Sequence, residues 1–124
     1  MALDRILVVD DTPIIRKSLE ERLRGKRLSV STAGSIAEAE KRLAANSFDL
    51  IFLDMELPDG DGRVFIERMS HSEAKPIVVM ITANGSVETV VECMRSGAFD
   101  YVTKPFSMTQ IDLVMKKASE FQRA

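Results

Sequence analysis

Short apolar runs alternate with amphipathic segments along the whole chain. Most of the runs are almost continuously apolar, which is typical of parallel strands that are covered on both faces. One run, Leu28-Ser29-Val30-Ser31-Thr32, alternates apolar and polar side chains, which predicts a short strand at a sheet edge. The pattern therefore predicts strands at residues 4–9, 28–32, 48–53, 77–81 and 98–103.

The segments between these strands repeat apolar residues at helical spacing, as Ile15, Leu19 and Leu23 do after the first strand. Hydroxyl side chains precede the repeats and are expected to cap the helices, at Thr12, Ser35, Ser86 and Ser107. Gly97 suits a helix C-terminus. The later helices are expected to bury Ile36, Ala39, Leu43, Val64, Phe65, Met69, Val87, Val90, Val91, Met94, Ile111, Val114, Met115 and Ala118.

Strands that alternate with helices predict an α/β, doubly wound domain spanning residues 1–124, with a five-stranded parallel sheet and five helices. Right-handed crossovers bring the carboxyl ends of all strands to one edge of such a sheet. In the flavodoxin-like strand order 2-1-3-4-5, ligands bind at that edge between strands one and three. The fold thus predicts where a functional site should lie.

Composition narrows the function classes. The 124 residues carry a net charge of −2 and scattered basic residues, which disfavours direct nucleic-acid binding. No apolar run is long enough to span a bilayer, and no signal-peptide pattern precedes the first strand, so we expect a cytoplasmic protein. The single cysteine, Cys93, is expected on a helix in or near the core, and the single histidine, His71, in a polar loop.

Charged residues follow three of the predicted strands. Asp10 and Asp11 end the first apolar run, Asp54 ends the third, and Lys104 follows the last. Carboxylates gathered at one sheet edge repel one another unless a cation joins them, and a lysine can meet an anion. The set therefore predicts a site for Mg²⁺ and a phosphoryl group, with Asp54 as the acceptor.

Plainer interpretations exist for single residues. Asp10 and Asp11 could simply be acidic residues that stabilise a helix N-terminus. The presence of Asp54 and Lys104 at the ends of other predicted strands argues against this interpretation. Asp59-Gly60-Asp61-Gly62 resembles part of a calcium loop, yet its glycines are misplaced and a turn is the better interpretation.

Four motifs occur in order at the ends of the predicted strands. They are Val8-Val9-Asp10-Asp11, Leu53-Asp54-Met55-Glu56-Leu57-Pro58 followed by Gly62, Thr82-Ala83, and Gly97-Ala98-Phe99-Asp100-Tyr101-Val102-Thr103-Lys104-Pro105-Phe106. Together they resemble the receiver domain of two-component response regulators over essentially the whole chain. The last motif resembles receivers of NtrC-type transcriptional activators. The resemblance implies a CheY-like fold.

The resemblance also implies a chemical role for each matched residue. Asp54 would accept a phosphoryl group, with Mg²⁺ held by Asp10, Asp11, Asp54 and the backbone carbonyl of Glu56. Lys104 would bind a phosphoryl oxygen. The domain would promote its own phosphorylation and dephosphorylation without being a turnover enzyme.

A conformational switch is implied as well. Thr82 would bond a second phosphoryl oxygen, and Tyr101 would turn inward as Thr82 moves. Pro105 would follow Lys104 through a cis peptide bond. Two alternatives stay open at this stage, because Thr82 could be a capping hydroxyl and Tyr101 a passive core aromatic.

The implied partners are a sensor histidine kinase or phosphotransfer protein and, through the fourth helix, fifth strand and fifth helix, a second copy of the chain. No nucleic acid or membrane is expected to bind this domain directly, and any output domain would lie outside it. Glu56 and Asn84 occupy positions where the family varies. Glu56 is expected to alter the lifetime of the phosphoryl group, and the Asn84 amide could orient a water near the site.

Other function classes share parts of the site. A phosphatase of the haloacid-dehalogenase type also uses a strand-end Asp, Mg²⁺, a Thr or Ser and a Lys. That family places a second Asp two residues after the nucleophile, where this chain has Glu56. A phosphorylation-independent interaction module is a further alternative. A flavodoxin is disfavoured, because no Ser/Thr/Gly-rich phosphate loop follows the first strand.

Overall fold

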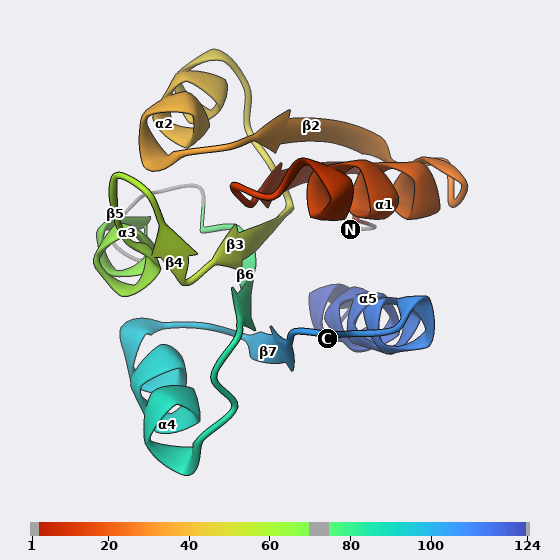
Figure 1. The fold of residues 1–124 in the computed structure, drawn as a ribbon. Helices are drawn as coiled ribbons and strands as arrows, with labels where there is room; N and C mark the ends of the chain where they lie inside the picture. The colour runs from red at the N-terminus through yellow and green to blue at the C-terminus, as the bar shows by residue number, and fades with distance from the viewer. Residues whose placement is uncertain (1–2, 70–74, 124) are drawn as a thin grey trace.

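The computed structural model describes residues 3–69 and 75–123 of the chain, so the loop predicted around His71 lies outside the described residues. Within these residues the chain forms five helices and seven strands (Figure 1). The helices are α1 (Pro13–Arg24), α2 (Ile36–Ala45), α3 (Gly62–Met69), α4 (Val87–Ser96) and α5 (Met108–Arg123). The strands are β1 (Arg5–Val9), β2 (Ser29–Ala33), β3 (Leu50–Asp54), β4 (Glu56–Leu57), β5 (Gly60–Asp61), β6 (Ile77–Thr82) and β7 (Asp100–Thr103).

The main sheet is parallel and has the strand order β2-β1-β3-β6-β7. This is the predicted order 2-1-3-4-5, because β4 and β5 pair only with each other and do not enter the main sheet. The sequence pattern predicted only a turn-rich loop at that place. The short antiparallel hairpin was missed because strands of two residues are too short to show a period.

Helices cover both faces of the main sheet. In Figure 1, α1 and α5 lie on one side, and α2, α3 and α4 lie on the other. Successive side chains of a strand point to opposite faces, so Ile6 and Val8 enter one apolar cluster while Leu7 and Val9 enter the other. Both faces of each central strand are therefore buried, which explains why the strands read as continuous apolar runs.

The helix starts follow the predicted caps in most cases. Ser35 Oγ accepts a hydrogen bond from the Glu38 N–H, and Ser86 Oγ accepts one from the Thr89 N–H. Thr12 occupies the cap position of α1, but its side chain makes no capping hydrogen bond. No helix within the described residues has both the length and the apolar character needed to cross a membrane.

Four residues that were predicted to be buried, in two helices, are exposed. Val64 in α3 is 57% exposed, and the apolar residues that this helix buries are Phe65 and Ile66. In α4, Val87, Val91 and Met94 face solvent, and the helix packs on the sheet through the buried Cys93. Helical spacing reveals that a helix has an apolar face, but it does not reveal whether the sheet or solvent lies beside that face.

Candidate functional site

The predicted site residues meet at one edge of the main sheet. Asp10 follows β1, Asp54 ends β3, Thr82 ends β6 and Lys104 follows β7. Because these strands are parallel and adjacent, their carboxyl ends share an edge. The prediction that strand-end residues would gather there is confirmed.

Three carboxylates form the centre of this edge. Asp10, Asp11 and Asp54 offer oxygens that all lie within 4.8 Å of one another. Asp10 and Asp54 are buried, whereas Asp11 is exposed. Lys104 Nζ lies 3.1 Å from Asp10 Oδ2 and 3.4 Å from Asp54 Oδ2, so one ammonium group faces both buried carboxylates.

The electrostatics of the site follow from burial. Burial raises the pKa of Asp54 to about 6, although the Glu56 N–H and Lys104 favour its charged form. The charge of Asp10 acts in the same direction as burial. For Lys104, burial alone would lower the pKa, but the contacts with Asp10 and Asp54 outweigh burial and raise it. The ammonium group therefore stays charged, while the acceptor carboxyl group loses its proton at a higher pH than an ordinary aspartate.

The donor set matches a small hard cation. Carboxylate oxygens are the ligands that Mg²⁺ prefers, usually together with carbonyl oxygens and water. Among the described residues, Asp10 Oδ2 is a buried side-chain oxygen that accepts no hydrogen bond, although it forms the ion pair with Lys104. A buried oxygen with an incomplete set of partners costs free energy, which a cation at the three carboxylates would recover. The residues present thus suit Mg²⁺.

Asp54 is hydrogen-bonded to the segment that follows it. Its Oδ1 accepts a hydrogen bond of 3.0 Å from the Glu56 N–H, and the Gly62 N–H bonds the Met55 carbonyl at 3.0 Å. A Cβ atom on Gly62 would lie 2.8 Å from the Asp54 carbonyl oxygen. Only glycine allows α3 to begin this close to the acceptor strand.

Thr82 is engaged in a local turn. Its hydroxyl donates to the Asn84 carbonyl at 3.1 Å and accepts from the Asn84 N–H at 3.0 Å. The Asn84 side chain in turn accepts from the Ser86 N–H at the start of α4. In this structure the Thr82 hydroxyl closes a local turn but does not cap α4, whose N-cap is Ser86. Tyr101 is partly exposed on β7 rather than a core residue, and the Lys104–Pro105 peptide is cis.

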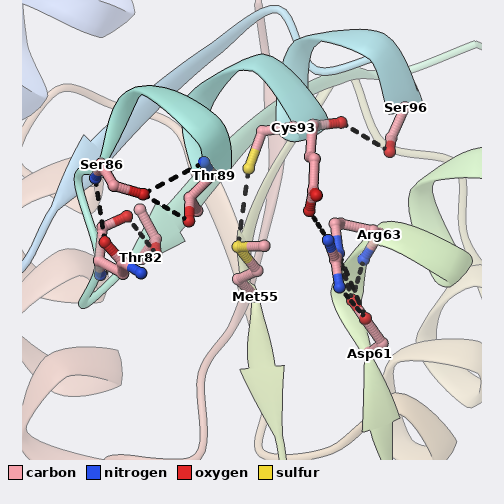
Figure 2. Close-up of polar contacts among 10 residues, drawn as sticks. Met55, Asp61, Arg63, Thr82, Ser86, Thr89, Cys93 and Ser96 are labelled. Carbon is pink, nitrogen blue, oxygen red and sulfur yellow. Dashed lines mark hydrogen bonds and ion pairs between the residues drawn. The ribbon is translucent and has the colours of Figure 1, made fainter.

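Two contacts that sequence reasoning missed attach α4 to the segment after Asp54 (Figure 2). Arg63 forms ion pairs with Asp61 of the hairpin and with Glu92 of α4. Cys93 Sγ, which points down from α4 in Figure 2, lies 3.6 Å from Met55 Sδ. No local pattern could have found the Arg63–Glu92 and Cys93–Met55 pairs, because each joins residues that are far apart in the sequence.

The hairpin also reaches α2. Both oxygens of Asp59 accept backbone hydrogen bonds at the start of that helix, from Ile36 at 2.8 Å and from Ala37 at 3.0 Å. These bonds hold the pKa of Asp59 below its usual value. Asp59 therefore caps a helix. The predicted turn is the tight connection between β4 and β5, and Gly62 already belongs to α3.

Comparison with known proteins adds to this geometry. Residues 6–116 match the family model of the response regulator receiver domain. The response regulator protein PilR of Pseudomonas aeruginosa is 38% identical over 111 residues, which are 90% of this chain and 25% of PilR. The regulatory protein AtoC of Escherichia coli K12 is 33% identical over 121 residues, which are 98% of this chain and 26% of AtoC.

A solved structure gives the same result. The solution structure of the beryllofluoride-activated NtrC4 receiver domain dimer superimposes with a TM-score of 0.86 at 39% identity, and the match covers 94% of this chain and 96% of that one. The chain spans about a quarter of the length of the curated relatives named above. A family model over most of the chain and relatives above 30% identity lead to one conclusion: the chain belongs to the receiver domains of response regulators.

Proposed function

We propose that this chain, as one domain over residues 1–124, is the phosphoacceptor switch of a two-component relay. In this relay Asp54 takes a phosphoryl group from a phosphohistidine of a sensor kinase or phosphotransfer protein. The observation that carries the proposal is the buried Asp54 carboxylate, held within 4.8 Å of the Asp10 and Asp11 oxygens and 3.4 Å from Lys104. That set is what phosphoryl transfer to a carboxylate requires.

Asp10, Asp11 and Asp54 would hold Mg²⁺, and the Glu56 carbonyl would complete the protein's share of the ligands. The chemistry that the ion supplies when bound is neutralisation of the negative charge that otherwise keeps a carboxylate and a phosphoryl group apart. Lys104 contributes a second positive charge on a flexible stem. Because it contacts Asp54 already, it can follow the phosphoryl oxygen after transfer.

The transfer step is a displacement at phosphorus. An Asp54 carboxylate oxygen forms the new P–O bond, and the P–N bond to the donor imidazole breaks. The imidazole leaves with the electron pair of that bond and takes up a proton. The product is an acyl phosphate, which water can later hydrolyse. Of the two Asp54 oxygens, Oδ1 accepts a hydrogen bond from the Glu56 N–H, while Oδ2 lies 3.4 Å from Lys104 Nζ.

Thr82 and Tyr101 would convert the new charge into a change of shape. Phosphorylation adds oxygens that accept hydrogen bonds, and the Thr82 hydroxyl would exchange its Asn84 partner for one of them. Tyr101, partly exposed on the edge strand β7, would then turn toward the space that Thr82 leaves. The two arrangements form a two-state element that the phosphoryl group biases.

The partner surface for the output would be the α4–β7–α5 surface. The exposed apolar side chains of these three elements are Val87, Val91, Met94, Tyr101, Leu113 and Phe121. Several apolar side chains gathered on one surface are typical of a binding site. A second copy of the chain is the occupant that we propose, since the NtrC4 receiver that resembles this chain is a dimer in its beryllofluoride-activated form.

Intact-protein mass spectrometry after incubation with acetyl phosphate tests the proposal. With Mg²⁺ we expect a gain of one phosphoryl group that is lost in base, and no gain without Mg²⁺. An Asp54→Ala variant is the control and should gain nothing. A Thr82→Ala variant should still be phosphorylated, because Thr82 is expected to act after transfer.

Two results would contradict the proposal in different ways. Steady release of phosphate from acetyl phosphate without a detectable adduct would indicate a phosphatase, although membership of the receiver family already weighs against that class. Neither adduct nor release would indicate an interaction module that does not depend on phosphorylation.

A further inference from the structure

Arg16 of α1 reaches back to the end of β1. Its Nη1 donates a hydrogen bond of 2.7 Å to the backbone carbonyl of Asp10. The same Nη1 atom lies against Gly34 in the loop before α2, where a Cβ atom would be only 2.9 Å from it. The guanidinium group is therefore confined between the end of β1 and a residue that has no side chain.

Asp10 has almost no freedom as a result. Its N–H donates to the Ala33 carbonyl at 3.0 Å, its Oδ1 accepts from the Thr12 N–H at 2.9 Å, and its carbonyl accepts from Arg16. The remaining polar atom, Oδ2, accepts no hydrogen bond and faces Lys104 at 3.1 Å. Every other polar atom of Asp10 is bound, so one oxygen alone is presented to the site.

We propose that Arg16 is a positioning residue for the acidic site. The carbonyl that it binds belongs to the peptide between Asp10 and Asp11, so Arg16 fixes the orientation of that peptide. Both carboxylates are thereby directed toward Asp54. The inference rests on the proposed function in one respect, namely that the site takes a divalent cation. It assigns to Arg16 a role that the site residues themselves do not reveal.

The charge of Arg16 and its positioning role predict opposite changes in Mg²⁺ affinity when Arg16 is replaced. A guanidinium group close to an acidic site repels a divalent cation, so removing the charge alone would make Mg²⁺ bind more tightly. Loss of a hydrogen bond that orients ligands instead weakens metal binding, by about tenfold or more in metal sites generally. The sign of the change therefore separates the two effects.

An NMR titration with MgCl₂ at constant ionic strength measures this sign. We expect Arg16→Met to raise the dissociation constant by about tenfold. Arg16→Lys keeps the charge and one donor, and it should recover part of the affinity. Arg24→Met is the matched control, because Arg24 also lies on α1 and also binds a backbone carbonyl, that of Val30 at 3.0 Å, but not at the site.

A second pair of variants tests the same contact without touching arginine. Gly34→Ala should displace the guanidinium group and weaken Mg²⁺ binding in the same direction as Arg16→Met. Gly25→Ala is its control, because a Cβ atom there would make ordinary contacts of 3.4 and 3.5 Å at a φ of −62°. We expect Gly25→Ala to bind Mg²⁺ as the wild type does.

Phosphorylation by acetyl phosphate gives an independent readout. In Arg16→Met the Mg²⁺ concentration for half-maximal rate should rise about tenfold, while the rate at saturating Mg²⁺ stays within about twofold of the wild type. The amide hydrogen of Thr12 should also exchange faster in the metal-free variant, since Asp10 is held less firmly.

Unchanged or tighter Mg²⁺ binding in Arg16→Met, with a normal fold by circular dichroism, would overturn the inference and leave the proposed function intact. If Arg16→Met failed to fold, normal affinity in Gly34→Ala would overturn it instead. If the wild type binds Mg²⁺ but accepts no phosphoryl group, the proposed function alone is contradicted. If the wild type binds no Mg²⁺, both the proposed function and the role of Arg16 are contradicted.

Discussion

Asp54 is held in a state that lowers the stability of the fold. Its side chain is buried at a sheet edge beside another carboxylate, and burial raises its pKa to about 6 from 3.8. A raised pKa for an acid means that the folded chain penalises the charged form. At neutral pH the acceptor is nevertheless ionised, so the native state carries this cost until a cation or a covalent modification relieves it.

We therefore expect Asp54→Asn to stabilise the metal-free protein at pH 7.5. Between pH 4 and 6 the folded wild type binds a proton that the unfolded chain has already released, so its stability falls as the pH rises through this window. A shift of about two pKa units corresponds to roughly 3 kcal/mol. Urea denaturation monitored by circular dichroism measures the gain.

The comparison of the wild type with Asp54→Asn has an internal control in its pH dependence. Below pH 4 the carboxyl group is neutral in both the folded and the unfolded wild type, so the difference between the two proteins should largely vanish there. Mg²⁺ at pH 7.5 should stabilise the wild type and narrow the gap, because it binds the folded state. A gap that is equal at pH 3.5 and pH 7.5 would rule out burial of the charge as its origin.

At the level of elements, α4 contacts both the sheet and the segment after Asp54. It buries one small side chain, Cys93, and exposes the apolar side of the helix. Arg63 links Glu92 to Asp61, and Cys93 contacts Met55, the residue next to the acceptor (Figure 2). A change at Asp54 therefore has a short physical route to α4 through these contacts.

We expect Arg63→Met to speed amide hydrogen exchange in α4, with little change in α2. Glu92→Gln should act in the same direction, and the double variant should be no worse than Arg63→Met alone. Because both side chains are partly exposed, the coupling free energy should be about 0.5 kcal/mol. Additive effects of the two substitutions would mean that the ion pair does not hold the helix.

At the scale of the whole molecule, the two edge strands of the main sheet differ in their side chains and in the helices beside them. The strand β2 carries mainly short and polar side chains at one edge, whereas β7 lies at the other edge between α4 and α5 (Figure 1). Apolar side chains are exposed on both of those helices, including Val91 and Leu113. The α4–β7–α5 surface is therefore the one through which we propose association.

We expect Mg²⁺ and acetyl phosphate to shift the protein from monomer toward dimer in analytical ultracentrifugation. Val91→Glu, on the α4–β7–α5 surface, should abolish the shift without lowering phosphorylation, because charge at the centre of an apolar contact is costly. Val64→Glu is the matched control, since Val64 is also an exposed valine but lies on α3. Equal loss of the dimer in both variants would argue against this surface.

Sequence reasoning located most of the site because the site depends on strand ends. Asp10, Asp54 and Lys104 each follow an apolar run, and the parallel sheet brings such positions together whatever the details of packing. Caps such as Ser35 and Ser86 were predictable for a related reason, since their partners lie three residues ahead.

The contacts that were missed depend on tertiary structure. Arg16 on Asp10, Asp59 on α2 and Arg63 on Glu92 are side-chain contacts whose partners are set by loop paths and helix rotation rather than by any period. The apolar side of α4 was misassigned because a hydrophobic period does not identify what the face contacts.

The capping of α2 by Asp59 has a consequence for insertions and deletions. Surface loops usually tolerate changes of length, because closing a slightly longer loop costs little entropy. Here Asp59 must reach the start of α2 while Arg63 reaches α4, and both are counted from Asp54. One residue added between Asp54 and Asp59 would displace both contacts at once, and one added between Asp59 and Arg63 would displace the contact of Arg63. Between Asp54 and Arg63, insertions and deletions should therefore be tolerated less well than substitutions of exposed residues.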